Sequence, residues 1–143
     1  MRGQKIGFMF QTFNLLSRLS ALSDVQLGMM YAGGVDRQRA RAALEKVGLA
    51  ARIKHRPIEL SGGEQQRVAI ARALVKDRSV FLADEPTGQM DSRSGQEVMA
   101  ILTSLNTDHG ITVMIVTHDS AVAHKCQRII HIRDGEIASE EKG

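Results

Sequence analysis

The 143-residue sequence contains no long hydrophobic run and only one cysteine. Its longest apolar stretches, such as Val113 to Val116, are far shorter than the roughly 18 to 20 residues that cross a bilayer. Met1 to Lys5 lead into a stretch too short for the hydrophobic part of a secretion signal. Cys126 can form no internal disulfide, which is consistent with a reducing compartment. We therefore expect a cytoplasmic protein that reaches a membrane only through a partner.

Internal repeats and low-complexity linkers are also missing from the sequence, so we expect a single globular unit. The contents of 43% hydrophobic and 24% charged residues are ordinary for a globular domain and exclude a disordered or fibrous chain. The net charge of +3 comes partly from a basic run between Arg37 and Arg56. Such a run could contact nucleic acid or lipid headgroups, but it is more often a solvated helix face. We expect no nucleic-acid partner.

The first part of the sequence predicts one strand followed by helices. Lys5 to Gln11 has the pattern of a strand, and a helix is expected from Ser23 to about Ala32, where two glycines follow. Asp36 suits the N-cap of a second helix, which has apolar residues at helical spacing and ends at Gly48. Residues 22–58 are therefore predicted to form a helical subdomain.

Residues 59–143 are predicted to form an α/β core with a parallel sheet. The expected elements are a helix from Ser61 to about Lys76, a strand over 80–83, a helix over 92–108 and a strand over 111–116. Both strands are continuously apolar, which predicts that helices cover both faces of the sheet. Asp134-Gly135 lies between two further apolar runs and predicts a β-hairpin that caps the end of the fold.

Two adjacent carboxylates, Asp84 and Glu85, follow the strand over 80–83. The carboxyl ends of parallel strands are where α/β sheets bind ligands. Asp84 suits Mg²⁺, which prefers hard oxygen ligands and keeps part of its water shell. Glu85 suits a general base that activates an attacking water. The alternative is a pair of surface carboxylates beyond a strand end.

The segment Ser61-Gly62-Gly63-Glu64 has the pattern of a helix start. Ser61 and Glu64 have capping-box spacing, which explains these two residues structurally. The two glycines remain unexplained by capping, since each has an entropic cost. They leave backbone N–H groups uncovered at the positive end of a helix, which predicts an anion site.

The stretch from Leu60 to Leu74 resembles the signature motif of the ABC ATPase family and the helix that follows it. Four further matches to the family's motifs occur in the family's order along the chain, at Gln11, Asp84-Glu85, Asp91 and His118. The resemblance implies a P-loop NTPase-like α/β fold, ATP as substrate and Mg²⁺ as cofactor. On its own, Gln11 would be taken for a polar loop residue, and the other histidines have no metal-ligand spacing.

The same resemblance implies a role for each matching residue. Asp84 and Gln11 are expected at the metal, with Gln11 also near the lytic water. Glu85 is expected to act as base, and His118 to contact the γ-phosphate. The nucleotide-binding residues are expected to be Ser61, Gly62, Gly63, Glu64 and Asp91. The implied partners are a second ABC ATPase subunit, bound head to tail, and a transmembrane permease subunit, which places the chain on the inner face of the cell membrane.

A finer resemblance is to exporter ATPases of the lipoprotein-release and macrolide-export type. It is carried by Ile6 to Leu16, Glu85 to Gly88 and Ile132 to Ile137. Gln89-Met90 departs from the Asn-Leu that is usual in this type. Because the family couples to its membrane partner through the region after Gln11, residues 11–32 are expected to dock the permease. Five apolar residues support this expectation: Phe13, Leu15, Leu16, Met29 and Met30.

The phosphate-binding pattern G-x-x-x-x-G-K-[ST] is absent from the sequence. We therefore interpret the sequence as the C-terminal portion of such an ATPase, either a fragment or a natural short form. A non-catalytic module that lends its signature motif to a full-length ATPase is the alternative. A DNA-repair type of ABC ATPase is disfavoured, because the chain has one cysteine and no sustained heptads.

We predict that the isolated chain binds ATP weakly and hydrolyses it no faster than background. The missing pattern would supply the N–H groups and the lysine that position the phosphates for transfer. Phosphate release by the purified chain measures this. Turnover that disappears in Glu85→Gln would contradict the prediction.

Overall fold

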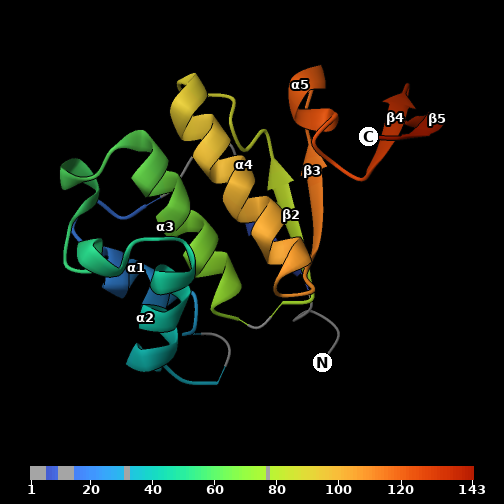
Figure 1. Cartoon of the computed structure of the whole chain (residues 1–143). Helices are drawn as coiled ribbons and strands as arrows, with labels where there is room; N and C mark the ends of the chain where they lie inside the picture. Colours follow the sequence, from blue (N-terminus) through green and yellow to red (C-terminus); the bar gives the residue numbers. More distant parts are fainter. Residues whose placement is uncertain (1–5, 10–14, 31–32, 77) are drawn as a thin grey trace.

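The computed structural model describes residues 6–9, 15–30, 33–76 and 78–143. Strands β1 (Ile6–Met9), β2 (Val80–Asp84) and β3 (Thr112–Val116) form a parallel sheet in that order. Helices α3 (Gly62–Leu74) and α4 (Ser92–Thr107) lie side by side against one face of this sheet (Figure 1). The predicted α/β fold with a parallel core is confirmed.

Two further helices and two short 3₁₀ turns pack on the far side of α3. They are α1 (Ala21–Leu27), α2 (Arg37–Lys46), η1 (Ala50–Arg52) and η2 (Pro57–Glu59). Asp36 caps α2 as predicted, since its side chain accepts hydrogen bonds from two backbone N–H groups of the first turn. Gly48 follows the end of α2 with a φ of +76°, a conformation that glycine adopts without steric cost. The predicted start of α2 is confirmed, and the helix ends at Lys46, two residues before the predicted end at Gly48.

The predicted bounds of α1 are wrong at both ends. The helix begins at Ala21, with Ser20 as its N-cap, and ends at Leu27 rather than near Ala32, which lies outside the described residues. The early end coincides with a close approach to α3. A Cβ on Gly28 would lie 2.7 Å from the backbone oxygen of Arg72, so only glycine fits here. The helix therefore ends where its backbone meets α3, which local sequence does not reveal.

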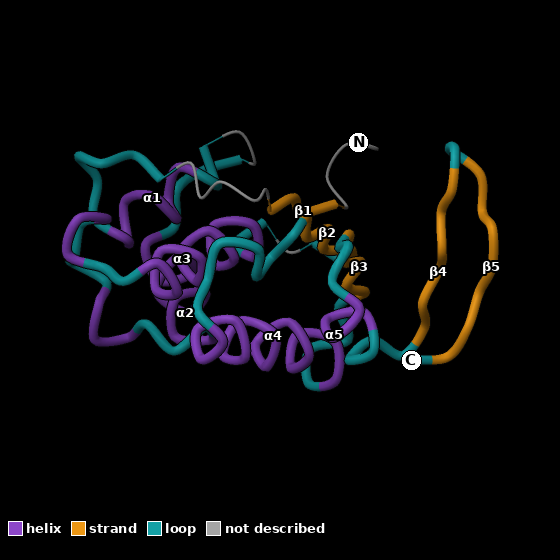
Figure 2. The backbone as a smooth tube through the Cα atoms, turned by 90° about the horizontal axis from the view of Figure 1, so that it is seen from above, coloured by secondary structure: helices purple, strands orange, loops and turns teal. Residues whose placement is uncertain are grey.

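In the part of the chain that the structure describes, helices cover one face of the sheet, so the expectation of two covered faces is not met. The face opposite α3 and α4 carries apolar side chains that are about half exposed. These residues are Ile6, Phe8, Met114 and Val116. On the other face Phe81 and Ala83 are fully buried. In Figure 2, α3 and α4 lie on the same side of the three strands. We call the face that carries Ile6, Phe8, Met114 and Val116 the open face of the sheet.

The predicted hairpin is present, but it does not cover the end of the fold. Strands β4 (Arg128–Arg133) and β5 (Glu136–Lys142) form a separate antiparallel pair around Asp134-Gly135. Figure 2 shows the pair standing apart from β1, β2 and β3, connected through the short helix α5 (Ser120–Ala123). Ile129 is buried, whereas every residue of β5 is exposed. The hairpin therefore contributes little to the core.

The two faces predict different effects of truncating large side chains. Phe81→Ala should lower the free energy of unfolding by about 3 to 5 kcal/mol, because it leaves a cavity in a packed core. Met114→Ala on the open face should lower it by about 1 kcal/mol or less. Equilibrium denaturation measures both. Equal losses would show that the open face is packed.

Candidate functional site

Parallel pairing brings the carboxyl ends of the three strands to one edge of the sheet. Met9 pairs with Ala83, and Ala83 pairs with Ile115, so the residues after β2 and β3 lie next to one another. Asp84, Glu85 and His118 therefore share this edge, as predicted from the sequence. Gln11 follows β1 by two residues and lies outside the described residues.

Glu85 is held by the segment that follows β3. Its backbone N–H donates to the Val116 carbonyl at 2.8 Å, which extends the strand pairing beyond β2. One carboxylate oxygen accepts from the Thr117 hydroxyl at 3.0 Å. The other accepts from the backbone N–H of His118 at 2.9 Å and from its ring Nδ1 at 2.5 Å. Three groups from Thr117 and His118 thus converge on this one carboxylate.

The backbone and charge of Glu85 both reflect this arrangement. Its φ of +45° is uncommon for a residue with a side chain. Partial burial acts to raise the pKa of the Glu85 carboxyl, but the hydrogen bonds from His118 and Thr117 outweigh burial and lower the pKa below its ordinary value. The carboxylate is therefore ionised at neutral pH, as a base must be.

Asp84 is the exposed last residue of β2, in register with Val116. No group of three or more histidine, cysteine or acidic side chains lies together in the part of the chain that the structure describes. Mg²⁺ does not need such a group, because it is often held by one or two carboxylates together with waters and substrate phosphates. A single exposed carboxylate at the strand end fits that donor set.

The start of α3 has the predicted capping box. The Ser61 hydroxyl accepts from the Glu64 N–H at 3.1 Å, and the Glu64 carboxylate accepts from the Ser61 N–H at 2.8 Å. This hydrogen bond from Ser61 is the main cause of a lowered Glu64 pKa, and Arg52, 3.2 Å away, contributes to it. Glu64 thus has structural partners, while Ser61 and Gly62 are exposed at the helix end.

The two glycines of this segment have different surroundings. A Cβ on Gly62 would meet open space, whereas one on Gly63 would lie 3.1 Å from the Cβ of Ser94. Gly63 therefore suits the close packing of α3 against the start of α4. Gly62 leaves the helix N-terminus uncovered without any such packing reason. Of the two, Gly62 fits the predicted anion site better.

Asp91 is the N-cap of α4, a role that the sequence reasoning did not assign to it. Its carboxylate accepts from the backbone N–H of Ser94 at 2.9 Å and from the Ser94 hydroxyl at 3.0 Å. The backbone bond is the main cause of a lowered Asp91 pKa. Asp91 followed by Ser92-Arg93-Ser94 is a pattern from which this cap could have been predicted.

Two residues at this edge were missed by the sequence reasoning. Thr117 supplies a hydroxyl to Glu85, and its position between a strand and His118 was the available signal. Gln66 is a buried residue of α3 whose amide donates to the Pro86 carbonyl at 3.1 Å. Its position on the inward face of a helix was the only hint in the sequence.

The apolar residues expected to dock a permease are only partly exposed. Leu16 and Met30 are exposed, Leu15 is partly buried, and Phe13 lies outside the described residues. Met29 is buried in the core, so its inclusion in the docking set was wrong.

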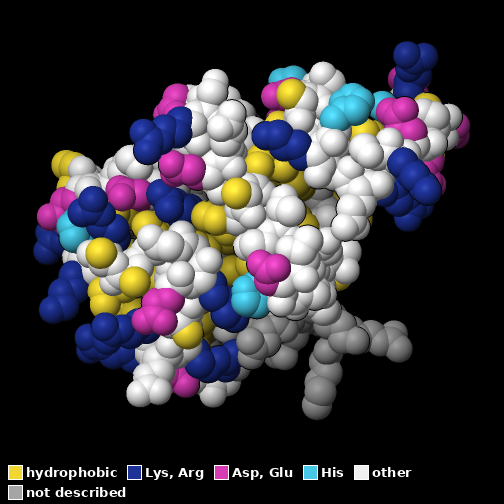
Figure 3. All heavy atoms as spheres, viewed as in Figure 1, with side chains coloured by type: hydrophobic (Ala, Val, Ile, Leu, Met, Phe, Trp, Pro, Cys, Tyr) yellow, Lys and Arg dark blue, Asp and Glu magenta, His cyan; other side chains and the backbone are white. Residues whose placement is uncertain are grey.

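The basic run forms part of the surface around α2, with acidic side chains interspersed (Figure 3). Arg41 pairs with Glu45 within α2, and Arg52 pairs with Glu64. Arg39 donates to the Val75 carbonyl at 3.1 Å. These intramolecular contacts favour the explanation of a solvated helix face.

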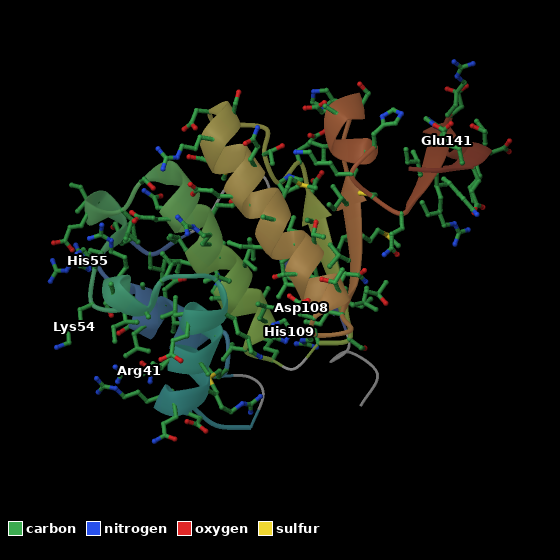
Figure 4. All side chains as sticks on the ribbon, viewed as in Figure 1. Arg41, Lys54, His55, Asp108, His109 and Glu141 are labelled. Atoms are coloured by element: carbon green, nitrogen blue, oxygen red, sulfur yellow. The ribbon has the colours of Figure 1, made fainter. Side chains whose placement is uncertain are left out.

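His55 and His109 lie away from the edge that carries His118. Figure 4 shows His55 beside the helices at one side and His109 at the end of α4, next to the start of β3. The ring of His124 contacts the Ser120 carbonyl, and that of His131 contacts Glu141. The Nε2 of His55 lies 3.4 Å from the Arg52 guanidinium. Its buried Nδ1 has no hydrogen-bond partner among the described residues, which departs from the expectation of a solvated or satisfied side chain.

Among the described helices, none has the length and hydrophobicity to span a bilayer. Residues 1–88 match the family model described as ABC transporter. The chain belongs to the ABC transporter ATPase family. The family is one of ATP-hydrolysing enzymes.

Relatives of the same family align with nearly the whole chain. The macrolide export ATP-binding/permease protein MacB of Syntrophobacter fumaroxidans is 48% identical over 98% of this chain, which corresponds to 20% of that protein. The ABC transporter ATP-binding protein YvrO of Bacillus subtilis is 49% identical over the full chain, which corresponds to 63% of that protein. The chain therefore spans about a fifth to two thirds of these relatives.

Solved ABC cassettes have the same fold. One is a dimeric ATP-binding cassette in a post-hydrolysis state with ADP and phosphate bound, 46% identical with a TM-score of 0.80. Another is CbiO1 from Clostridium perfringens, part of an ABC transporter complex, 30% identical with a TM-score of 0.88. The chain aligns over 97% of its length with each and covers 63% and 57% of them, respectively. The P-loop NTPase-like fold is therefore confirmed.

The contacts of Glu85 in this ABC domain predict a pH-dependent effect of Thr117→Val. The variant loses one hydrogen bond to the carboxylate, so the pKa of Glu85 should rise toward its ordinary value of 4.5. A carboxyl whose pKa is lower in the folded than in the unfolded state stabilises the fold at pH values above its unfolded-state pKa. This stabilisation is lost as the pH falls through the folded-state pKa. The stability difference from wild type should therefore be largest near neutral pH and shrink on acidification.

Carbon-13 NMR titration of the Glu85 carboxyl and denaturation at several pH values measure this effect. Thr112→Val, at the opposite end of β3, is the matched control and should leave the Glu85 titration unchanged. An unchanged titration in Thr117→Val would show that the hydroxyl does not hold the carboxylate.

Proposed function

We propose that the chain is the ATP-binding and ATP-hydrolysing part of an exporter-type ABC transporter. The observation that carries this proposal is the edge of the sheet, where Glu85 is ionised and fixed beside His118 while Asp84 stays exposed next to it. An ionised, positioned carboxylate next to a separate metal-binding carboxylate is what hydrolysis by an activated water requires.

Each residue has a separate part in this chemistry. Asp84 and Gln11 would hold Mg²⁺, which would neutralise charge on the phosphates when bound. Glu85 orients the attacking water and takes its proton, and His118 contacts the γ-phosphate while holding the Glu85 carboxylate. Ser61, Gly62 and Gly63 present hydroxyl and N–H groups to a nucleotide, with Glu64 and Asp91 beside them. Glu64 and Asp91 act mainly by holding the starts of α3 and α4 in place.

The partners follow from the same division of groups. We infer a second ATPase subunit, bound head to tail. The signature segment stands at the start of α3 and the carboxylates stand at the end of β2, so each subunit would offer its signature segment to the carboxylates of the other. A related cassette that was solved as a dimer supports this inference. MacB, whose name joins an ATP-binding part and a permease, supports a transmembrane partner and macrolide-type export. The chain then lies on the inner face of the membrane.

The permease contact is proposed for residues 11–32, within or next to the helical subdomain of residues 22–58. Leu16 and Met30 are the exposed apolar residues of the described part of this segment. Both lie close in sequence to α1, which packs on α3. A movement at the permease could thus reach the helix that begins with Ser61.

A second candidate is a non-catalytic module that completes the site of a full-length ATPase. The observation that favours it is the start of α3, where Ser61 and Gly62 are exposed and can face the nucleotide of a partner. The two candidates differ in whether Glu85 takes part in chemistry.

We predict that Glu85→Gln, in the chain joined to a segment supplying the missing pattern, loses hydrolysis but keeps ATP. Glutamine preserves the shape and removes the base, so the rate should fall about 10² to 10⁴-fold. Asp84→Asn should instead weaken Mg²⁺-dependent nucleotide binding. Steady-state turnover and nucleotide binding measure the two effects.

Trapped ATP should hold the Glu85→Gln protein as a closed dimer in size-exclusion chromatography with ATP and Mg²⁺. Adding Ser61→Arg should abolish the dimer, since the large side chain blocks the exposed end of α3. A Glu85→Gln protein that stays monomeric, or hydrolyses at the wild-type rate, would show that Glu85 is not the base.

A further inference from the structure

Gln66 is a polar side chain in the core that ordinary packing does not explain. It is 1% exposed and lies on α3, five residues after the N-cap Ser61. Its amide oxygen is buried and has no hydrogen-bond partner among the described residues. Burial of an unpaired polar atom destabilises a fold, and an apolar side chain of similar size would fill the same space without that cost.

The amide nitrogen of Gln66 connects three segments of the site. It donates to the Pro86 carbonyl at 3.1 Å, directly after Glu85. It also lies 3.2 Å from the sulfur of Met9, the last residue of β1. Pro86 and Met9 are both buried, so water cannot substitute for these contacts. Gln66 therefore joins the helix that begins with Ser61 to the turn that carries Glu85.

Two neighbouring contacts join α3 to α4. Gly63 packs closely on Ser94, and Arg67 pairs with Glu97 of α4 at 3.4 Å. These contacts fix α3 against α4, but neither reaches the turn after β2. The Gln66 bond, in contrast, ends on Pro86, the residue that follows Glu85.

We infer that Gln66 is a positioning residue that holds the Glu85 turn in a fixed relation to the signature end of α3. This inference rests on the proposed function for its consequence. In a head-to-tail dimer, Ser61 serves the partner's nucleotide while Glu85 of the same chain serves its own. The Gln66 amide then connects the two nucleotide sites through the interior of each subunit.

Gln66→Met tests the structural part of the inference, because methionine has similar length and no amide. Gln65→Met is the matched control: Gln65 is the preceding residue, and its amide donates to the Pro57 and Leu60 carbonyls near its own helix start. Hydrogen exchange in the 143-residue chain reports on the turn through the N–H groups of Gly88 and Met90, which bond to Glu85 and Thr87.

We expect Gln66→Met to speed exchange at Gly88 and Met90 about tenfold, the effect of losing one hydrogen bond, while exchange in α3 and the melting temperature stay near wild type. Gln65→Met should leave Gly88 and Met90 unchanged. Unchanged exchange in Gln66→Met, or faster exchange throughout the chain with a lower melting temperature, would show that Gln66 is only a core residue.

Kinetics test the consequence, in the chain joined to the missing phosphate-binding segment. We expect Gln66→Met to lower kcat with KM for ATP unchanged, and to lower the Hill coefficient toward one. Altered exchange with unaltered kinetics would overturn the coupling role. Absence of turnover in the parent protein, with altered exchange in Gln66→Met, would instead count against the proposed function and leave the positioning role standing.

Discussion

The parallel, in-register pairing of β1, β2 and β3 determines where each polar group of the site lies. All three strands run in one direction, so their carboxyl ends meet at one edge. The bond from the Glu85 N–H to the Val116 carbonyl continues this pairing into the turn. This bond brings the Glu85 carboxylate to Thr117 and to His118. The φ of Glu85 is +45°, and the backbone strain of that conformation accompanies this placement.

Helix α3 links that edge to the rest of the molecule. At its start, Gly63 and Arg67 pack on α4, and farther along Arg72 pairs with the buried Asp24 of α1 at 3.2 Å. Burial raises the pKa of Asp24, and the Arg72 charge opposes this effect. The same carboxylate lies 3.4 Å from the Leu16 N–H. Asp24 therefore connects Leu16, which precedes α1, to Arg72 of α3, the helix whose N-cap is Ser61.

The sequence predicted features that depend on local chemistry and missed those that depend on distant contacts. The caps at Asp36 and Ser61 and the strands β2 and β3 were predicted, because capping patterns and apolar runs are short-range signals. The end of α1 was misplaced, because Gly28 is required by the backbone of Arg72, which is remote in sequence. Continuous apolar strands indicated two apolar faces, but could not show what covers each. The partners of Thr117 and Gln66 likewise appear only once the sheet is assembled.

Strand alternation explains why adjacent carboxylates are suited to different tasks. Asp84 follows Leu82 by two residues, so its side chain lies on the open face, in register with Val116. Glu85 lies beyond the strand, where the turn brings it to the segment after β3. One carboxylate is therefore left exposed for a cation, and the other is fixed by three hydrogen-bond donors. Any segment that covered the open face at its carboxyl end would border Asp84. The exposed apolar surface and Asp84, the proposed Mg²⁺ ligand, therefore lie at the same corner of the sheet.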